Sequence, residues 1–328
     1  MACRIHFIVT SWVAARPRGR EKRTLSRVSV ARHYTPCPMK DLVVQGPALS
    51  SEALDTFKVV CMPERIRVAG PSARCVAVPD DLEVRRAVRG LGDYWKLDCA
   101  FVDPDWRLAD FRVLALDMDS TLITIESLDE VAALAGRGAE VAAITEAAMR
   151  GGIADYSESL RRRVAMLAGV DAALLQRVHD EKLALSDGAE RLVSACRAAG
   201  LKTLLVTGGF TYFTDRMRAR LGFDATRSNE LEIIDGRLSG KVTGAGGTAI
   251  VDAEGKAQAV RDLCAEIGCP TDRSIVVGDG ANDLKMMALA GISVAWRAKP
   301  VVRDKATFAL SHAPLDGVLA WFAEAAPC

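Results

Sequence analysis

Two aspartates separated by one residue follow a short apolar run, and their spacing could support acid–base or nucleophilic chemistry. The run Val113-Leu114-Ala115-Leu116 is followed by Asp117-Met118-Asp119-Ser120-Thr121. This pattern predicts a buried strand that ends at the edge of a parallel sheet, where α/β proteins bind ligands. Residues i and i+2 of a strand lie on one side, so Asp117 and Asp119 can face one pocket. Because two buried like charges repel, the pair requires a compensating charge, most simply a divalent cation.

An Asp-x-Asp pair alone is weak evidence, because metal-free turns and calcium-binding loops also contain it, but three further segments support a site. A second apolar strand ends in Thr207-Gly208-Gly209, Lys256 lies at the start of an amphipathic helix, and a third strand ends in the acidic loop Asp279 to Asp283. Together these segments supply an acidic metal site, a hydroxyl, backbone N–H groups and an ammonium. Phosphoryl transfer needs this combination of groups.

These segments resemble the four motifs of the haloacid dehalogenase superfamily of phosphatases. The motifs are DMDST at 117–121, TGGF at 207–210, Lys256, and GDGAND at 278–283. Longer stretches, such as YSESLRRRV and NELEIIDGRLSGKV, are similar to the phosphoserine phosphatases of that superfamily, and the resemblance covers about residues 110–310. The chain has Thr207 where phosphoserine phosphatases usually have serine, which keeps the hydroxyl and adds a methyl group.

The resemblance implies a covalent mechanism that depends on two carboxylates. Asp117 would be the nucleophile that forms an aspartyl-phosphate, and Asp119 would act as the general acid and then as the general base. Mg²⁺ would be bound by Asp117, by Asp279 and by the backbone carbonyl of Asp119. Asp283 would orient Lys256 or a metal-bound water, or it would cap the following helix.

The remaining core motifs would bind the substrate. By resemblance, the Thr207 hydroxyl, the Gly208 N–H group and the Lys256 ammonium hold the phosphoryl oxygens. Lys256 would neutralise charge that builds up during transfer. Asn282 would contact the phosphate or the rest of the substrate.

A helical segment after the first motif would recognise the amino-acid part of the substrate. The resemblance assigns Glu126 to the serine ammonium and Arg163 to its carboxylate. Arg161, Arg162 and Arg163 are consecutive, so helical geometry points them about 100° apart and they cannot all face one pocket. The family pattern S-L-R-x-R-V selects Arg163. Tyr156 and Met149 would line the entrance or belong to the core of the cap.

The order of the elements predicts an α/β fold with a doubly wound parallel sheet. We expect a disordered basic extension at 1–38, a small N-terminal α+β domain at 39–108, a haloacid dehalogenase-like core at 109–123 and 187–328, and a helical cap at 124–186. In the N-terminal domain we expect strands at 42–44 and 74–78 and helices at 51–57 and 81–91. Asp235-Gly236 predicts a hairpin turn. The N-terminal domain resembles an amino-acid-binding domain in position, and a packing role without a ligand is the alternative.

Composition restricts the partners of this chain. The 328 residues carry a net charge of +1, and residues 1–38 hold eight Lys/Arg but only one acid, so the remainder is mildly acidic and does not suggest nucleic-acid binding. No apolar stretch reaches the roughly 18–20 residues that cross a membrane. Nine scattered cysteines favour reduced thiols and the cytoplasm. A basic tail is the favoured interpretation of the N-terminus, with a signal or transit peptide as the alternative.

The expected activity is hydrolysis of O-phospho-L-serine to L-serine and phosphate, the last step of L-serine biosynthesis, by a monomer or homodimer. The alternative is a phosphatase or phosphotransferase for another small phosphomonoester, and the Glu126–Arg163 pair argues against substrates without an amino-acid head. A binding protein without catalytic activity is a third interpretation, and the four intact motifs argue against it.

Overall fold

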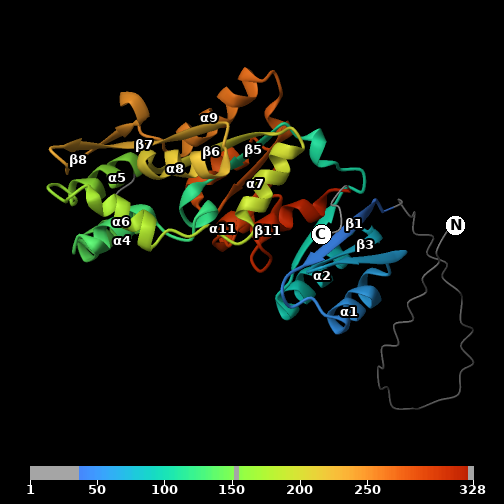
Figure 1. The fold of residues 1–328 in the computed structure, drawn as a ribbon. Coiled ribbons are helices and arrows are strands. Elements are labelled where there is room, and N and C mark those ends of the chain that lie inside the picture. Colours follow the sequence, from blue (N-terminus) through green and yellow to red (C-terminus); the bar gives the residue numbers. More distant parts are fainter. Residues whose placement is uncertain (1–36, 151–154, 324–328) are drawn as a thin grey trace, which may run out of the picture. The chain divides into compact units, whose positions relative to one another are not determined.

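A seven-stranded sheet forms the centre of the computed structural model, which describes residues 37–150 and 155–323. The strand order is β11-β10-β9-β5-β6-β7-β8 (Figure 1). The bounds are β5 Val113–Leu116, β6 Lys202–Phe210, β7 Ala225–Ile234, β8 Arg237–Gly244, β9 Ser274–Gly278, β10 Ile292–Trp296 and β11 Phe308–Leu310. Each neighbouring pair is parallel except β7 and β8, which run antiparallel. The sheet is therefore mixed, with one antiparallel strand at its edge.

Helices cover both faces of this sheet. They are α7 Ala189–Ala198, α8 Thr211–Leu221, α9 Ala253–Glu266, α10 Leu284–Met287 and α11 Pro300–Arg303. Along β5, Leu114 and Leu116 belong to one apolar cluster and Val113 and Ala115 to another, because alternate residues of a strand point to opposite faces. Two cores on opposite faces are the mark of a doubly wound sheet, so the predicted fold class is confirmed.

The hairpin turn predicted at Asp235-Gly236 joins β7 to β8. Both residues have left-handed backbone conformations, with φ of 50° and 75°. A two-residue hairpin turn of this kind requires positive φ at both positions, which Asp-Gly accepts more readily than most pairs. The sequence therefore predicted both the turn and the antiparallel pairing of β7 with β8 that a hairpin implies.

Four helices of the described chain lie in the cap segment, between Thr124 and Ser186. They are α3 Ser127–Leu134, α4 Gly138–Met149, α5 Tyr156–Ala165 and α6 Ala173–Glu181. The chain leaves and returns to the core through paired segments, since Thr124 N–H donates to Ala184 O (2.9 Å) and Ser186 N–H donates to Leu122 O (2.9 Å). No helix in the described ranges is long and apolar enough to cross a membrane.

The N-terminal part of the described chain forms a separate four-stranded antiparallel sheet. Its order is β2-β3-β1-β4, with β1 Met39–Gln45, β2 Arg65–Ala69, β3 Ser72–Pro79 and β4 Asp98–Val102, and with helices α1 Ser51–Cys61 and α2 Leu82–Trp95. The expected strands at 42–44 and 74–78 lie within β1 and β3. β2 and β4 were not predicted. Each is only five residues long, and in β2 two arginines, Arg65 and Arg67, also interrupt the apolar run. The expected disordered extension falls largely on residues 1–36, outside the described residues.

Both faces of the N-terminal sheet are covered. Leu42 and Val44 pack with Phe57 of α1 in a local core. On the opposite face, Val43 and Val102 join the large cluster that includes the central sheet. The sheet thus connects two apolar layers and is not an independent surface module.

The buried carboxylate of Asp98 fixes this sheet to the C-terminal part of the chain. It accepts three hydrogen bonds, from the N–H groups of Ser311, His312 and Ala313, each 2.8 Å long. Nearby, Arg74 donates to the carbonyl oxygen of Ala320 (2.8 Å). A buried carboxylate that accepts from three backbone donors is a strong local anchor, because its charge is compensated by all three and the N–H group of Ala313 would otherwise be buried without a partner.

We predict that Asp98→Ala lowers the free energy of unfolding by about 2–4 kcal/mol, because three backbone N–H groups lose their acceptor. Urea unfolding measures this change. The matched control is Asp304→Ala, which removes an exposed ion pair with Arg89 (3.2 Å) and should cost at most about 1 kcal/mol. Equal effects of the two substitutions would contradict the anchoring role.

Candidate active site

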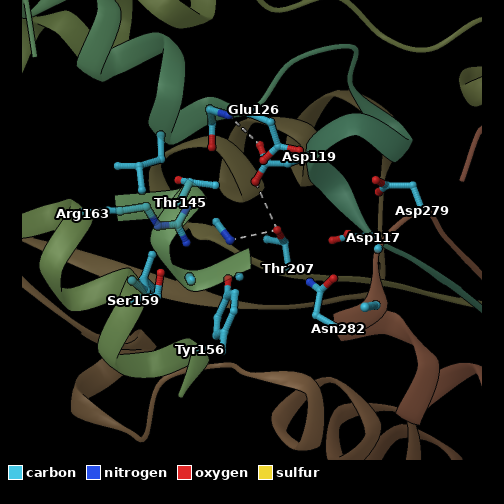
Figure 2. A pocket seen from close by; sticks show the side chains of 18 of the residues that line it. Asp117, Asp119, Glu126, Thr145, Tyr156, Ser159, Arg163, Thr207, Asp279 and Asn282 are labelled. Atoms are coloured by element: carbon cyan, nitrogen blue, oxygen red, sulfur yellow. Dashed lines mark hydrogen bonds between the residues drawn. The ribbon is translucent and has the colours of Figure 1, made fainter. Parts of the chain in front are cut away.

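The three motif-bearing strands meet at one edge of the central sheet. Asp117 directly follows β5, Thr207 and Gly208 lie near the end of β6, and Asp279 directly follows β9, and these strands are neighbours. Their carboxyl ends border a cavity of about 490 Å³. All nine residues predicted for the site line it: Asp117, Asp119, Glu126, Arg163, Thr207, Gly208, Lys256, Asp279 and Asn282. Figure 2 shows the core residues on one side of this cavity and the cap residues on the other.

Lys256 lies between two buried carboxylates. Its ammonium is 2.7 Å from Asp117 Oδ1 and 2.7 Å from Asp283 Oδ1. Its position is set by the start of α9, where the Asp252 side chain accepts from Gly255 N–H. Burial alone would lower the pKa of Lys256, but the two carboxylates outweigh burial and raise that pKa, so the ammonium stays charged.

The side chain of Asp283 contacts Lys256, as one of the two roles left open by the sequence requires, and it makes no cap hydrogen bond to the following helix α10. One oxygen accepts from Lys256, and the other accepts from the Gly280 N–H group (3.0 Å) at the start of the short helix Ala281–Asp283. The side chain therefore orients the ammonium and stabilises the acidic loop together.

Three carboxylates form a group that could hold a metal ion. One oxygen each of Asp117, Asp279 and Asp283 lies within 4.8 Å of the others, and the Thr121 hydroxyl donates to Asp279 (2.9 Å). Burial and then Asp283 raise the pKa of Asp279 to about 6. With all groups ionised, one ammonium leaves the three carboxylates with excess negative charge, which a divalent cation would balance. The all-oxygen donor set fits Mg²⁺.

This group differs from the ligand set expected from the sequence. It contains the carboxylate of Asp283 and lacks that of Asp119, for which the sequence predicted coordination through the backbone carbonyl. Since a carboxylate group says nothing of backbone ligands, the role of Asp119 at the metal stays a prediction.

The carboxylate of Asp119 faces the second motif and the start of the cap. It accepts from Ser127 N–H (3.0 Å) and from the Thr207 hydroxyl (3.4 Å). Burial, followed by the charge of Glu126, raises the pKa of Asp119 to about 7. A carboxyl group with such a pKa can give and take a proton near neutral pH.

A tight turn between the first motif and the cap was not predicted. Residues Met118–Leu122 form a tight, non-helical turn in which Asp119 is extended and Ser120 lies in the left-handed region, with φ of 56°. The Ser120 hydroxyl donates to Glu126 (2.7 Å). The turn thereby fixes Glu126 near Asp119, and no pattern in the sequence identified Ser120 as its key residue.

On the cap side, Arg163 is the arginine that faces the cavity. Its Nε is buried and has no hydrogen-bond partner among the described residues. Its neighbour Arg162 is exposed and pairs with Glu158 (2.7 Å), and Arg161 is exposed as well. Tyr156 also lines the cavity, whereas the side chain of Met149 lies outside the described residues. A buried donor without a partner is costly, which suits a site where a ligand supplies the acceptor.

The buried amide of Asn229 connects two motifs and was missed in the sequence. It donates to the Gly208 carbonyl oxygen (2.8 Å) and accepts from Val251 N–H (2.8 Å). Val251 directly precedes Asp252, the N-cap residue of α9. The Asn229 side chain therefore positions the glycine motif relative to Lys256. No local signal in the sequence marked Asn229, because β7 contains several polar and charged residues among which this asparagine does not stand out.

Comparisons with known proteins agree with this geometry. The family described as haloacid dehalogenase-like hydrolase matches residues 114–288, more than half of the chain. The chain belongs to this hydrolase family. The resemblance predicted from the four motifs is therefore confirmed.

Relatives of this hydrolase include curated and structurally determined proteins. A phosphoserine phosphatase of Polaromonas sp. (strain JS666 / ATCC BAA-500) is 55% identical over 216 residues, which are 66% of this chain and 92% of the relative. The unliganded crystal structure of a probable phosphoserine phosphatase from Vibrio cholerae has a TM-score of 0.74 and 35% identity, and covers 86% of each chain. A phospho-aspartyl intermediate analogue of a phosphoserine phosphatase has a TM-score of 0.59 and 30% identity, over 65% of this chain and 99% of the other.

We predict that Asn229→Ala lowers stability by about 1–3 kcal/mol, because it leaves a buried carbonyl and a buried N–H group unpaired. It should also reduce kcat/KM on an aryl phosphate at least about tenfold, since small displacements in a site are costly. Urea unfolding and steady-state kinetics measure the two effects. Gln258→Ala, which removes an exposed amide bonded to Asp262, is the control. Wild-type kinetics in Asn229→Ala would rule out the positioning role.

Proposed function

We propose that this hydrolase is a Mg²⁺-dependent phosphatase that converts O-phospho-L-serine to L-serine and phosphate, the last step of L-serine biosynthesis. One observation carries the proposal. A single cavity of about 490 Å³ joins a phosphoryl end, made by Asp117, Thr207 and Lys256, to an end that holds Glu126 and Arg163, whose buried Nε has no partner among the described residues. The first end suits a phosphate and the second suits an α-amino acid.

In the proposed first step, a carboxylate oxygen of Asp117 attacks phosphorus and forms an aspartyl-phosphate. The bond between phosphorus and the serine oxygen breaks, and Asp119 gives its proton to that oxygen. The Thr207 hydroxyl, the Gly208 N–H group and the Lys256 ammonium stabilise the phosphoryl oxygens as charge develops. One of the solved structures that this chain resembles is a phospho-aspartyl intermediate analogue of a phosphoserine phosphatase, which supports an intermediate of this kind.

In the proposed second step, Asp119 acts as a base. It removes a proton from a water molecule, whose oxygen attacks phosphorus and releases phosphate from Asp117. The pKa of Asp119, raised to about 7 first by burial and then by Glu126, suits a group that must be protonated in one step and ionised in the next.

The metal and the substrate head are assigned to separate groups. Asp117, Asp279 and the backbone carbonyl of Asp119 would hold Mg²⁺, with Asp283 beside them, and a bound cation would neutralise phosphoryl charge as a Lewis acid. Arg163 would bind the serine carboxylate and Glu126 the serine ammonium. A cytoplasmic location and a monomeric or homodimeric state, expected from the sequence, stay predictions.

The substrate profile tests the activity directly. With Mg²⁺ present, kcat/KM for O-phospho-L-serine should exceed that for sugar phosphates by at least about 100-fold, because only the amino acid satisfies both Arg163 and Glu126. Phosphate release is the measurement. A higher kcat/KM for a substrate without an amino-acid head would favour the alternative, a phosphatase for another small phosphomonoester.

Chelation tests the metal. We expect EDTA to abolish turnover and excess Mg²⁺ to restore it, because the carboxylate group must be neutralised before it admits a phosphate dianion. Asp279→Asn should raise the Mg²⁺ concentration needed for half activation. Asp272→Asn, a change in an exposed acid of the turn before β9, should not raise it. Full activity in EDTA would exclude metal dependence.

Two adjacent arginines separate recognition from chemistry. Arg163→Ala should raise KM for O-phospho-L-serine by about 30-fold or more, since removing one partner of a buried charge pair costs roughly 2–5 kcal/mol. Hydrolysis of p-nitrophenyl phosphate, which has no carboxylate, should change little. Arg162→Ala should leave both reactions unchanged, because that guanidinium is exposed and bonds only to Glu158 among the described residues. Equal losses on both substrates in Arg163→Ala would contradict the assignment.

A further inference from the structure

The hydroxyl group of Tyr156 points into the cavity without a use in the mechanism above. Tyr156 is the first residue of α5, and the Asp155 carboxylate caps this helix by accepting from Ser157 and Glu158 N–H groups (3.1 and 3.2 Å). Figure 2 shows the phenol between Arg163 and Thr207. Its hydroxyl makes no hydrogen bond to any residue that the structure describes. The helix α5 thus holds this donor facing the cavity, where it is free to bond to a ligand.

This hydroxyl lies directly against the glycine motif of the core. A methyl group built on Gly208 would be 1.9 Å from the hydroxyl oxygen and 3.0 Å from Cζ of Tyr156. Gly208 has no left-handed backbone conformation, so the close approach of Tyr156 is a reason for glycine here. The Gly208 carbonyl oxygen already accepts from Asn229. The phenol therefore reaches the segment that is proposed to hold the phosphoryl oxygens.

Burial keeps the Tyr156 hydroxyl protonated and therefore able to donate a hydrogen bond. Burial is the largest influence and raises the pKa of Tyr156, with Lys256 and Arg163 opposing that rise. Tyr156 and Arg163 are seven residues apart on one helix, about two turns, and so share a face. One cap helix thus presents both a head-group contact and a neutral donor to the cavity.

We infer that the Tyr156 hydroxyl donates a hydrogen bond to a non-bridging oxygen of the phosphoryl group and is a further catalytic residue. The inference rests on the proposed phosphatase function and deepens it, because the cap then contributes to the chemistry as well as to recognition. The acceptor is an anion held beside the buried side chains of Asp117, Thr207 and Lys256, where a fixed donor is most effective. A ring that served only as an apolar wall would not need the hydroxyl.

Tyr156→Phe in the full-length protein tests this inference, because it removes one oxygen and keeps the ring. We expect kcat to fall about 10- to 100-fold on both O-phospho-L-serine and p-nitrophenyl phosphate, the range for a hydrogen bond to a charged group. The KM for O-phospho-L-serine should rise less than kcat falls, because the hydrogen bond is strongest as charge develops in the transition state. Calorimetric binding of inorganic phosphate in the presence of Mg²⁺ should weaken to the same extent as KM rises, and this readout requires no turnover.

Tyr212→Phe is the matched control, because the Tyr212 hydroxyl lies on α8 and bonds to Gln176 (2.5 Å) outside the cavity. It should change neither kcat nor phosphate binding. Wild-type kcat and phosphate binding in Tyr156→Phe would overturn the inference, and so would a loss confined to KM for O-phospho-L-serine. A wild-type protein that hydrolyses no phosphomonoester would refute the proposed function instead. Phosphate binding would still test the hydroxyl in that case: weaker binding by Tyr156→Phe than by Tyr212→Phe would support its contact with phosphate, and equal binding would overturn it.

Discussion

The contact of the Lys256 ammonium with Asp117 and Asp283 is the interaction on which the rest of the site depends. All three groups are almost completely buried, and taking charges out of water costs several kcal/mol each unless their geometry is well satisfied. Each partner is accordingly held by its own local structure. The Asp252 cap sets the start of α9, Asp283 also closes its loop on Gly280, and Asp117 follows a fully buried strand. The cost of burying these three charges is understandable if their function is to bind a highly charged ligand.

The two sides of the cavity carry different tasks. The core supplies groups that bind a phosphoryl unit, and the cap supplies Glu126, Tyr156 and Arg163. None of the described lining residues belongs to the N-terminal sheet, which instead packs on the core and is anchored through Asp98. The amino-acid-binding role and the packing role that the sequence left open for that sheet both stay predictions.

Much of this could be predicted from the sequence, because its signals are local. An apolar run followed by Asp117 and Asp119 fixed a strand end, Asp235-Gly236 fixed a hairpin, and the pattern around Arg163 selected one arginine of three. The other features depend on segments that meet only in the folded chain. Asn229 links two motifs, Asp283 joins the carboxylate group, and Gly208 gives room to Tyr156, and none of these contacts has a local pattern. β2 was missed since its two arginines hide a short alternation, and β4 was missed since it is only five residues long.

The proposed chemistry requires that the phosphoryl group pass through Asp117. Its most direct test is a single turnover with excess enzyme and ³²P-labelled O-phospho-L-serine, quenched in acid and followed by peptide mapping. We expect transient protein-bound phosphate that is labile to hydroxylamine, as an acyl phosphate is, on the peptide containing Asp117, and we expect none in Asp117→Asn. Release of phosphate without any protein-bound label, or label on another residue, would refute a covalent mechanism at Asp117.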